Sequence, residues 1–133
     1  MKRILILALM VADAAANAQV VRSGSHKIMI FGGSDHKVYL GCLSCSSSAS
    51  DSVLNSYGPH GSKYSSESIF NTYGDYGGKY SSGSPCNSYP SDPPVVVDED
   101  GGYYGELTID TTRSRRAQSE ILNSWLVGVC QGQ

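Results

Sequence analysis

Hydrophobic and polar positions along the chain predict two β-hairpins separated by a long polar region. The first hairpin has strands at residues 27–31 and 38–43, joined by a turn that begins Gly-Gly-Ser-Asp. The second has strands at 95–98 and 103–109, joined by Glu-Asp-Gly-Gly. The second strands resemble each other, with YLGCLS in one and YYGELT in the other. We therefore expect a small antiparallel sheet of two related hairpins.

Apolar residues near the C-terminal end follow the spacing of a helix. They recur at intervals of 4, 1, 3, 1 and 3, at Ala117, Ile121, Leu122, Trp125, Leu126 and Val129. This spacing puts one apolar stripe on a helix of residues 114–130, which would cover the sheet. The predicted fold class is therefore α+β.

The polar region between the hairpins contains a sixteen-residue repeat. Its two full copies, at residues 52–67 and 68–83, read SVLNSYGPHGSKYSSE and SIFNTYGDYGGKYSSG, and a third begins SPCNSYP at Ser84. A low-complexity linker would not hold Asn, Tyr, Gly and Lys in phase, so we expect ordered loops over residues 52–89.

Local conformation within each copy follows from its glycines and its apolar pair. We expect the Tyr-Gly steps to form turns, because glycine allows a positive φ there. The apolar pairs are Val53-Leu54, Ile69-Phe70 and Pro85-Cys86. We expect each pair to lie in a short helical turn against a core shared with the flanking hairpins and helix, because so few copies cannot bury a core alone.

Four cysteines predict two disulfides that brace the domain, at Cys42, Cys45, Cys86 and Cys130. Three connectivities are open on the sequence. Cys86 replaces the Leu and Phe of the other copies, so we expect it to point inward toward another half-cystine. Cys130 would join the helix either to the repeat or to the strand that carries Cys42 and Cys45.

The first eighteen residues have the features of a secretory signal peptide. Lys2 and Arg3 precede nine apolar residues at 4–12, and Ala-Asn-Ala at 16–18 provides a cleavage site before Gln19. A membrane anchor needs roughly 20 apolar residues. We therefore expect residues 19–133 to form one exported domain without a membrane span, either periplasmic or extracellular.

Composition supports a small domain and argues against a nucleic-acid partner. Of 133 residues, 40% are hydrophobic and 17% charged, and the formal net charge is −2. Such a chain has no basic stripe for a phosphate backbone. The cluster of Arg113, Arg115 and Arg116 is interpreted as a solvated linker or a dibasic cleavage site, because a helix N-terminus disfavours cations.

Several motifs resemble catalytic or metal sites, but each has a simpler structural interpretation. Cys42 and Cys45 have the spacing of a redox pair, yet they end a strand rather than begin a helix, so a structural disulfide is preferred. Ser34 and Lys37 match a Ser-x-x-Lys pattern within a hairpin turn. The acidic turn at residues 98–101 could hold calcium, although a plain hairpin turn is preferred.

Zinc is disfavoured because Cys86 and Cys130 are isolated and the histidines, His26, His36 and His60, form no close pair. We therefore assign no catalytic, cofactor-binding or metal-ligating residue and expect no cofactor.

The nine tyrosines are the remaining candidate for function. Tyrosine beside Ser, Gly and Asn is typical of adaptable binding surfaces, since the ring offers contact area while its hydroxyl stays hydrated. The rings could equally pack over the loops as a lid on a thin core, which we favour over recognition. If a glycan or peptide is bound, the candidate residues are Tyr57, Tyr64, Tyr73, Tyr76 and Tyr80.

The chain resembles a family of small secreted bacterial proteins of uncharacterised function with Tyr-Gly-Ser-Asn repeats. The resemblance lies in the repeats, in the LGCLSC segment and in PPVVVDEDGGYYGELT. The resemblance covers about residues 38–109. It implies export and a shared fold, and it brings no activity, cofactor or catalytic residue. One departure is His60, which stands where the second copy has Tyr76.

The sequence therefore predicts a non-catalytic binding or structural module with a tyrosine-rich surface. The alternative is a small secreted enzyme, either a hydrolase or a thiol oxidoreductase that uses Cys42 and Cys45.

Overall fold

The computed structural model describes residues 26–133. The predicted signal peptide, residues 1–18, lies outside the described residues.

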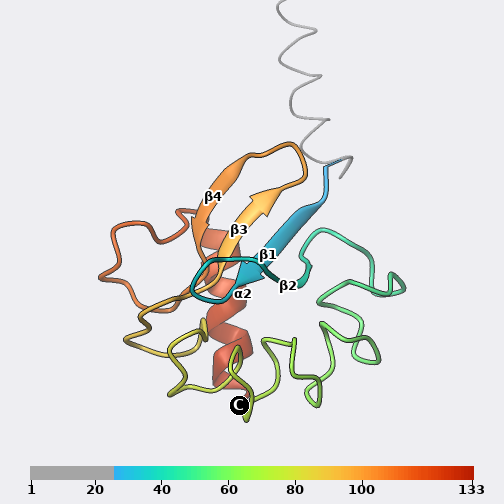
Figure 1. Cartoon of the computed structure of the whole chain (residues 1–133), viewed down its shortest axis with the longest axis horizontal. Coiled ribbons are helices and arrows are strands. Elements are labelled where there is room, and N and C mark those ends of the chain that lie inside the picture. Colours follow the sequence, from blue (N-terminus) through green and yellow to red (C-terminus); the bar gives the residue numbers. More distant parts are fainter. Residues whose placement is uncertain (1–25) are drawn as a thin grey trace, which may run out of the picture.

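A four-stranded antiparallel sheet confirms the two predicted hairpins (Figure 1). Its strands are β1 (Ile28–Gly32), β2 (Val38–Cys42), β3 (Val95–Asp98) and β4 (Tyr103–Glu106). The spatial order is β2-β1-β3-β4, so the hairpins meet where β1 pairs with β3. The last strand ends at Glu106 rather than at Ile109. Leu107 N still donates to Pro94 O, next to β3, but Pro94 has no N–H to return a bond, and Ile109 N donates to Pro85 O in the third copy of the repeat.

The two hairpins also share their irregularities. Pairing slips between Ile30 and Phe31 in one hairpin and between Val96 and Val97 in the other. The partner strands carry glycines of positive φ, 120° at Gly41 and 116° at Gly105, a conformation that disfavours other residues. The similarity between YLGCLS and YYGELT therefore reflects the same bulged geometry.

Short segments pair with the two outer strands. Ser52 forms a parallel bridge with Cys42 of β2, and Arg116 forms one with Glu106 of β4. In each case the strand residue donates its backbone N–H to the residue before the bridge partner, Asp51 or Arg115, at 2.8 Å. Each edge strand is therefore partly covered by a later part of the chain.

The helix α2 (Glu120–Gln131) is shorter than predicted, because it begins at Glu120 instead of residue 114. Ser119 is its N-cap, with Oγ accepting a bond from Leu122 N at 3.2 Å. The preceding segment is held to β4: Ala117 N donates to Glu106 O at 2.9 Å. This pairing at the β4 edge cannot be read from helical periodicity.

Arg113 does not lie in a solvated linker. Its guanidinium bonds both carboxylate oxygens of the buried Glu106, at 2.7 and 3.1 Å, and donates to Pro90 O at 2.8 Å. Arg116 likewise donates from Nε to Thr108 O at 2.8 Å. These two arginines hold the chain that leads into α2.

The repeat region is a succession of hydrogen-bonded turns rather than helices. Each serine that opens a copy accepts a bond at Oγ from the backbone two residues later, at 3.0–3.1 Å, in the pairs Ser52–Leu54, Ser68–Phe70 and Ser84–Cys86. Each asparagine accepts a bond at Oδ1 from the N–H of the tyrosine two residues later, in Asn55–Tyr57, Asn71–Tyr73 and Asn87–Tyr89. Such side-chain bonds replace helical hydrogen bonds.

The Tyr-Gly steps form turns as expected, but their glycines are needed for close packing and not for a positive φ. Gly58 and Gly74 are not among the residues of positive φ. A Cβ at either position would lie 3.2 Å from the Nδ2 of the asparagine in its own copy, and at Gly61 or Gly77 it would meet the carbonyl of that asparagine. Larger side chains would therefore displace the asparagine on which each turn depends.

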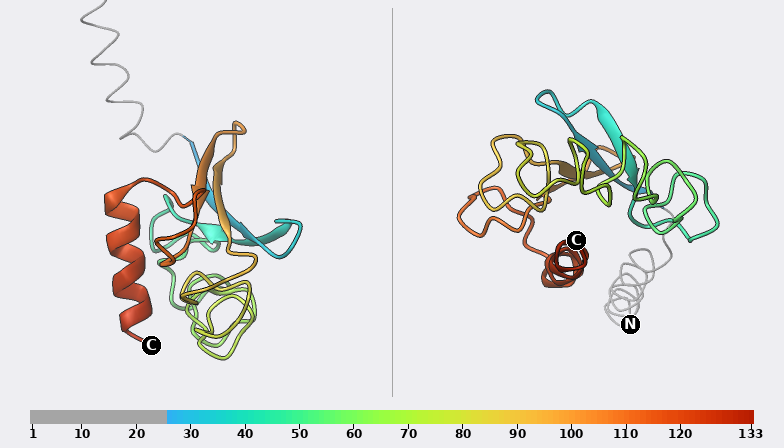
Figure 2. Two further views of the ribbon diagram at one scale, coloured as in Figure 1. Left: turned by 90° about the vertical axis from the view of Figure 1, so that its left-hand side faces the viewer. Right: turned by 90° about the horizontal axis from the view of Figure 1, so that it is seen from below.

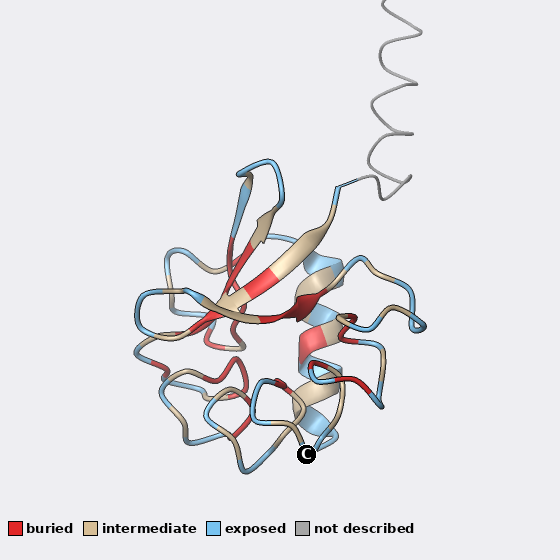
Figure 3. Cartoon of the chain, turned by 45° about the vertical axis from the view of Figure 1, so that its right-hand side comes forward, coloured by how far each residue is buried: buried red, intermediate tan, exposed pale blue. Residues whose placement is uncertain are grey.

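One core joins the sheet, the repeats and the helix (Figures 2 and 3). The first residue of each apolar pair is buried as expected, at Val53, Ile69 and Pro85. The second differs among copies: Leu54 is 52% exposed, Phe70 is half-buried and Cys86 is buried. The ring of Phe70 lies edge-on to Trp125 of α2, with centroids 6.3 Å apart.

Both predicted disulfides are formed. Cys86 bonds to Cys130, which ties α2 to the third copy, and Cys42 bonds to Cys45. The expectation that Cys86 points inward toward another half-cystine is confirmed. Figure 2 shows the C-terminal end of α2 beside the repeat loops.

Candidate functional site

Most tyrosines of the repeats are exposed, so the expectation that they pack inside is wrong for these rings. Their exposed fractions lie between 83% and 99%, at Tyr57, Tyr64, Tyr73, Tyr80 and Tyr89. Tyr76 differs, because it is half-buried against the core, and this burial raises its pKa.

His60 occupies the inward position of the first copy, as Tyr76 does in the second. It is buried, with its ring edge-on to Tyr39 at 4.9 Å between centroids. Its Nδ1 lies within hydrogen-bond distance of Glu67 O, at 3.0 Å. The sequence difference at this position therefore preserves an aromatic contact with the core and leaves the exposed rings unchanged.

The exposed rings are carried on fixed backbone. The N–H groups of Tyr57, Tyr73 and Tyr89 are bound by the preceding asparagines, and Tyr64 N donates to Ser62 Oγ at 3.1 Å. The backbone of each turn is thus held in place while the phenol projects into solvent. A ring presented in this way loses little conformational entropy when it binds a partner.

Two equivalent grooves lie between the repeats and the end of α2. The first, of about 510 Å³, is lined by Lys63, Tyr64, Phe70, Asn71, Thr72 and Tyr73, with Val129, Gly132 and Gln133 opposite. The second, of about 550 Å³, is lined by residues sixteen positions later, Lys79, Tyr80, Cys86, Asn87, Ser88 and Tyr89, together with Ile109, Val127, Cys130 and Gln131. The repeat therefore builds the same groove twice.

A third groove connects these two. It has a volume of about 500 Å³ and shares Tyr73 and Gln133 with the first groove and Lys79 and Tyr80 with the second. We call the continuous surface the tyrosine track and define it by Tyr64, Tyr73, Tyr80 and Tyr89 with Lys63 and Lys79. Asp75 also lines the middle groove.

The lysines give the ends of the track a positive charge. Lys63 is the one charged residue in the lining of the first groove, and Lys79 in that of the second. The Nζ of Lys63 lies 5.7 Å from the ring centroid of Tyr64, within range of a cation–π interaction. The ends of the track can thus offer an aromatic face and an ammonium group together.

The predicted set of ligand-binding tyrosines overlaps the track only in part. Tyr64, Tyr73 and Tyr80 belong to it, whereas Tyr57 is not in the lining of the three grooves and Tyr76 is half-buried. The predicted set did not include Tyr89 or the two lysines. The sequence signal for them is their shared phase in the repeat, which places each at the same point of successive turns.

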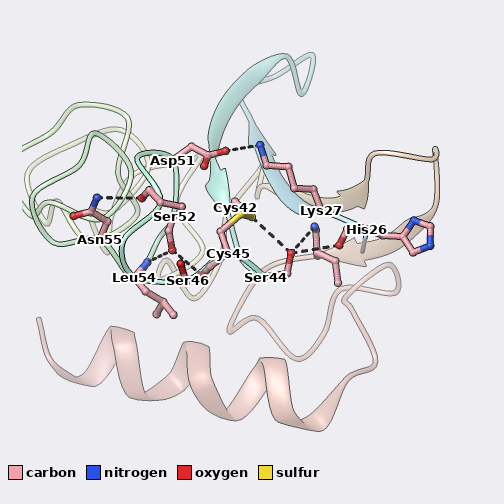
Figure 4. Close-up of a disulfide and its surroundings, with 12 residues drawn as sticks. His26, Lys27, Cys42, Ser44, Cys45, Ser46, Asp51, Ser52, Leu54 and Asn55 are labelled. Atoms are coloured by element: carbon pink, nitrogen blue, oxygen red, sulfur yellow. Dashed lines mark hydrogen bonds and ion pairs between the residues drawn. A yellow bond between two sulfur atoms is a disulfide. The ribbon is translucent and has the colours of Figure 1, made fainter. Parts of the chain in front are cut away.

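The Cys42–Cys45 disulfide lies at the end of β2 and leads into turns (Figure 4). Cys42 is buried and Cys45 is half-buried. Ser52 Oγ donates to Cys45 O at 3.0 Å, and Ser44 Oγ lies 3.6 Å from Cys42 Sγ. The disulfide therefore lies within a bonded loop without the helix N-terminus that activates redox thiols.

A charged cluster beside this disulfide joins Asp51 to β1 and β2. Asp51 Oδ2 accepts from Lys27 Nζ at 2.7 Å and from the Tyr39 hydroxyl at 2.6 Å. Lys27 and then Tyr39 lower the pKa of Asp51, while burial and the Asp51 carboxylate raise the pKa of Tyr39. This arrangement fixes the segment that pairs with the edge of β2.

The two motifs considered for chemistry at the hairpin tips are turns. Asp98 Oδ1 accepts from the backbone N–H groups of Asp100 and Gly102, and its Oδ2 accepts from the Tyr104 hydroxyl. These bonds lower the pKa of Asp98, that from Tyr104 most. Ser34 and Lys37 flank a turn closed by His36 N to Gly33 O at 3.1 Å. Within residues 26–133, no group of three or more His, Cys, Asp or Glu side chains is placed to hold a metal ion.

Across the part of the chain that the structure describes, no helix has the length and hydrophobicity needed to cross a bilayer. Comparison with known proteins adds no relative, because no family model, curated protein or solved structure matches this chain.

Proposed function

We propose that the protein is a non-catalytic binding module whose tyrosine track binds a glycan. The observation that supports this most is the exposure of four rings along one continuous surface, each at least 83% exposed. The backbone N–H groups of three of them, Tyr64, Tyr73 and Tyr89, are bound by neighbouring side chains. Exposed aromatic surface gathered in one place is typical of an interaction site. A sugar ring offers an apolar face for such rings and hydroxyl groups for the amides of Asn71 and Asn87.

A glycan fits the track better than a peptide does. Extended peptides commonly bind by adding a strand to a free sheet edge. Here residues 51–53 and 115–117 already cover part of the edges of β2 and β4. The duplicated groove instead matches a ligand made of repeated units, as a polysaccharide is.

Two disulfides favour an oxidising compartment. We therefore propose that the protein acts outside the cytoplasm, in the periplasm or the extracellular space, where polysaccharides are abundant.

The second candidate is an enzyme that uses Cys42 and Cys45 for thiol–disulfide exchange. One observation favours it: Cys45 is half-buried whereas Cys42 is buried, so Cys45 is the more accessible residue of the pair. The absence of a helix N-terminus at the pair places this candidate behind binding. Failure of the oxidised protein to accept electrons from dithiothreitol-reduced thioredoxin would eliminate it.

The binding proposal is tested with a panel of immobilised neutral and acidic polysaccharides. The wild type should be retained on at least one of them, and the triple variant Tyr64→Ala, Tyr73→Ala, Tyr80→Ala should lose that retention. Tyr57→Ala is the matched control, because Tyr57 is 98% exposed but is not in the lining of the three grooves. Retention on no polysaccharide, or equal retention of the triple variant, would contradict the proposal.

A further inference from the structure

We propose that the tyrosine track binds a linear acidic polysaccharide, with Lys63 and Lys79 pairing with carboxylates on two different units of one chain. This inference rests on the proposed glycan-binding function and names its ligand class.

The equivalence of the end grooves is the first step. Each consists of a lysine followed by a tyrosine, an asparagine seven residues further on and a second tyrosine two residues after it, in Lys63-Tyr64-Asn71-Tyr73 and Lys79-Tyr80-Asn87-Tyr89. Surfaces with the same groups in the same order select the same chemical unit. A ligand that fills both must therefore present that unit twice.

The continuity of the track is the second step. The middle groove shares Tyr73 with one end groove and Tyr80 with the other. One extended chain can therefore contact both ends without leaving the surface. Once the first unit is bound, the second binds at the high effective concentration set by the connecting sugars.

Charge is the third step. The protein has a formal net charge of −2, yet the linings of the two end grooves contain one lysine each and no Asp or Glu side chain. Among the described residues, neither Lys63 nor Lys79 forms a salt bridge with Asp or Glu. The one acidic side chain in the linings of the three grooves, Asp75, lies in the middle groove, so the side-chain attraction for an anion is concentrated at the ends. A polymer with carboxylates on separate units fits this pattern.

The test compares each acidic polymer with its own methyl ester, which keeps the sugar backbone and removes the charge. The probes are polygalacturonate, alginate and hyaluronan, with affinity measured by biolayer interferometry at low and high salt. We expect at least one free acid to bind about tenfold or more tightly than its ester, and we expect salt to weaken that binding.

Variants locate the interaction. Lys63→Ala and Lys79→Ala should each weaken binding of the long polymer about tenfold, because each leaves only one charged groove. Lys37→Ala, an exposed lysine in the β1–β2 turn, is the matched control and should bind as the wild type does. Either single variant retains one charged groove, so a long polymer gains nothing from its additional units. A short oligomer and the long polymer should therefore bind each variant with nearly equal affinity per chain.

The outcomes separate the inference from the proposed function. Binding that requires the tyrosines, but whose affinity is unchanged by esterification and by replacement of either lysine, would overturn the inference and leave the glycan-binding proposal intact. Loss of binding in Lys37→Ala as large as in Lys63→Ala would also overturn it, because the attraction would then be general. Binding to no polysaccharide of either kind would overturn both.

Discussion

Each copy of the repeat depends on one asparagine whose side chain bonds in two directions. Its Oδ1 accepts a bond from the tyrosine N–H two residues later, and its Nδ2 donates to the carbonyl six residues earlier at 2.8–3.1 Å. The three equivalent residues are Asn55, Asn71 and Asn87. Asn123 makes the same backward bond, to Ala117 O at 2.8 Å. Its Oδ1 is nevertheless buried without a partner in the described structure, because α2 directs backbone N–H groups to carbonyls one turn earlier.

Replacing Asn71 with alanine should therefore destabilise the fold. The change removes two hydrogen bonds, to Tyr73 N and Ser65 O, and leaves Ser65 O unpaired in a part-buried place, whereas Tyr73 N is exposed to water. We expect the free energy of unfolding in denaturant to fall by about 1–3 kcal/mol. Ser66→Ala, at an exposed position of the same copy, should change it by less than about 0.5 kcal/mol. Equal effects of the two changes would show that the asparagine bonds do not stabilise the turn.

The cluster of Asp51, Lys27 and Tyr39 predicts that the folded state becomes less stable at acidic pH. Lys27 and Tyr39 hold the pKa of Asp51 below its ordinary value, so the folded state favours the ionised carboxylate. This contribution is complete above pH about 4, the ordinary value, and is lost as the pH falls through the lowered pKa of the folded state. Asp51→Asn should therefore be less stable than the wild type at pH 7 and should approach it near pH 2.

Thermal unfolding followed across that pH range would measure the effect. Glu99→Gln is the control, because the described structure gives the exposed Glu99 side chain no hydrogen bond or ion pair. A stability difference between Asp51→Asn and the wild type that stayed constant down to pH 2 would mean that ionisation of Asp51 is not its cause.

At the scale of elements, the hairpins could be predicted because their strands and turns are local in sequence. The start of α2 could not, because Ala117 fits the helical spacing yet bonds to Glu106 across the β4 edge. β4 ends at Glu106 because Pro94 has no N–H to continue the ladder and Ile109 N donates to the distant Pro85 O. Non-local partners of this kind override periodicity and leave no local sequence signal.

The regular spacing of the repeat predicts which residues form the candidate site, but it does not predict which of their rings are exposed. The repeat places Lys, Tyr and Asn at equal intervals, which is enough to find Tyr64, Tyr73 and Tyr80. Whether a ring points outward depends on what the core already contains: Tyr76 faces Gly32, where space exists for it. Val127 and Val129 complete the grooves only because α2 ends beside the repeats.

The two disulfides should differ in their contribution to stability. Cys86–Cys130 spans 44 positions and Cys42–Cys45 spans only 3. Because a disulfide restricts the unfolded chain more when its loop is longer, we expect the Cys86→Ser, Cys130→Ser variant to lose about 4 kcal/mol and the Cys42→Ser, Cys45→Ser variant about 2 kcal/mol. Equilibrium unfolding in urea would measure both losses. A larger loss from the short loop would contradict this account.

At the scale of the whole molecule, the regular secondary structure of residues 26–133 is confined to the sheet and one helix, yet the turns between them are held at short intervals. Bonds from Ser62 N to Gly58 O and from Gly78 N to Gly74 O precede Lys63 and Lys79. Cleavage by a protease requires several residues to unfold locally. Trypsin should therefore spare the bonds after both exposed lysines in the native protein.

Reduction and alkylation of Cys86 and Cys130 should expose these bonds, because the third copy then loses its attachment to α2. Mass spectrometry of the digestion products would identify the sites, and the urea-unfolded chain is the control that both bonds can be cut. Rapid cleavage after Lys63 in the native, oxidised protein would show that the turns are not rigid.

The parallel bridge from Ser52 to β2 and the start of β3 at Val95 fix the two ends of the repeat region on one sheet, on the two strands that flank β1. Adjacent strands lie about 4.8 Å apart, so the distance between these anchors is set by the number of strands. Tandem duplication of a sixteen-residue unit would lengthen the region without widening the sheet, and the surplus turn would find no place between the anchors. The spacing of these strands thus limits the copy number and, under the proposed function, the length of polymer that one molecule would hold.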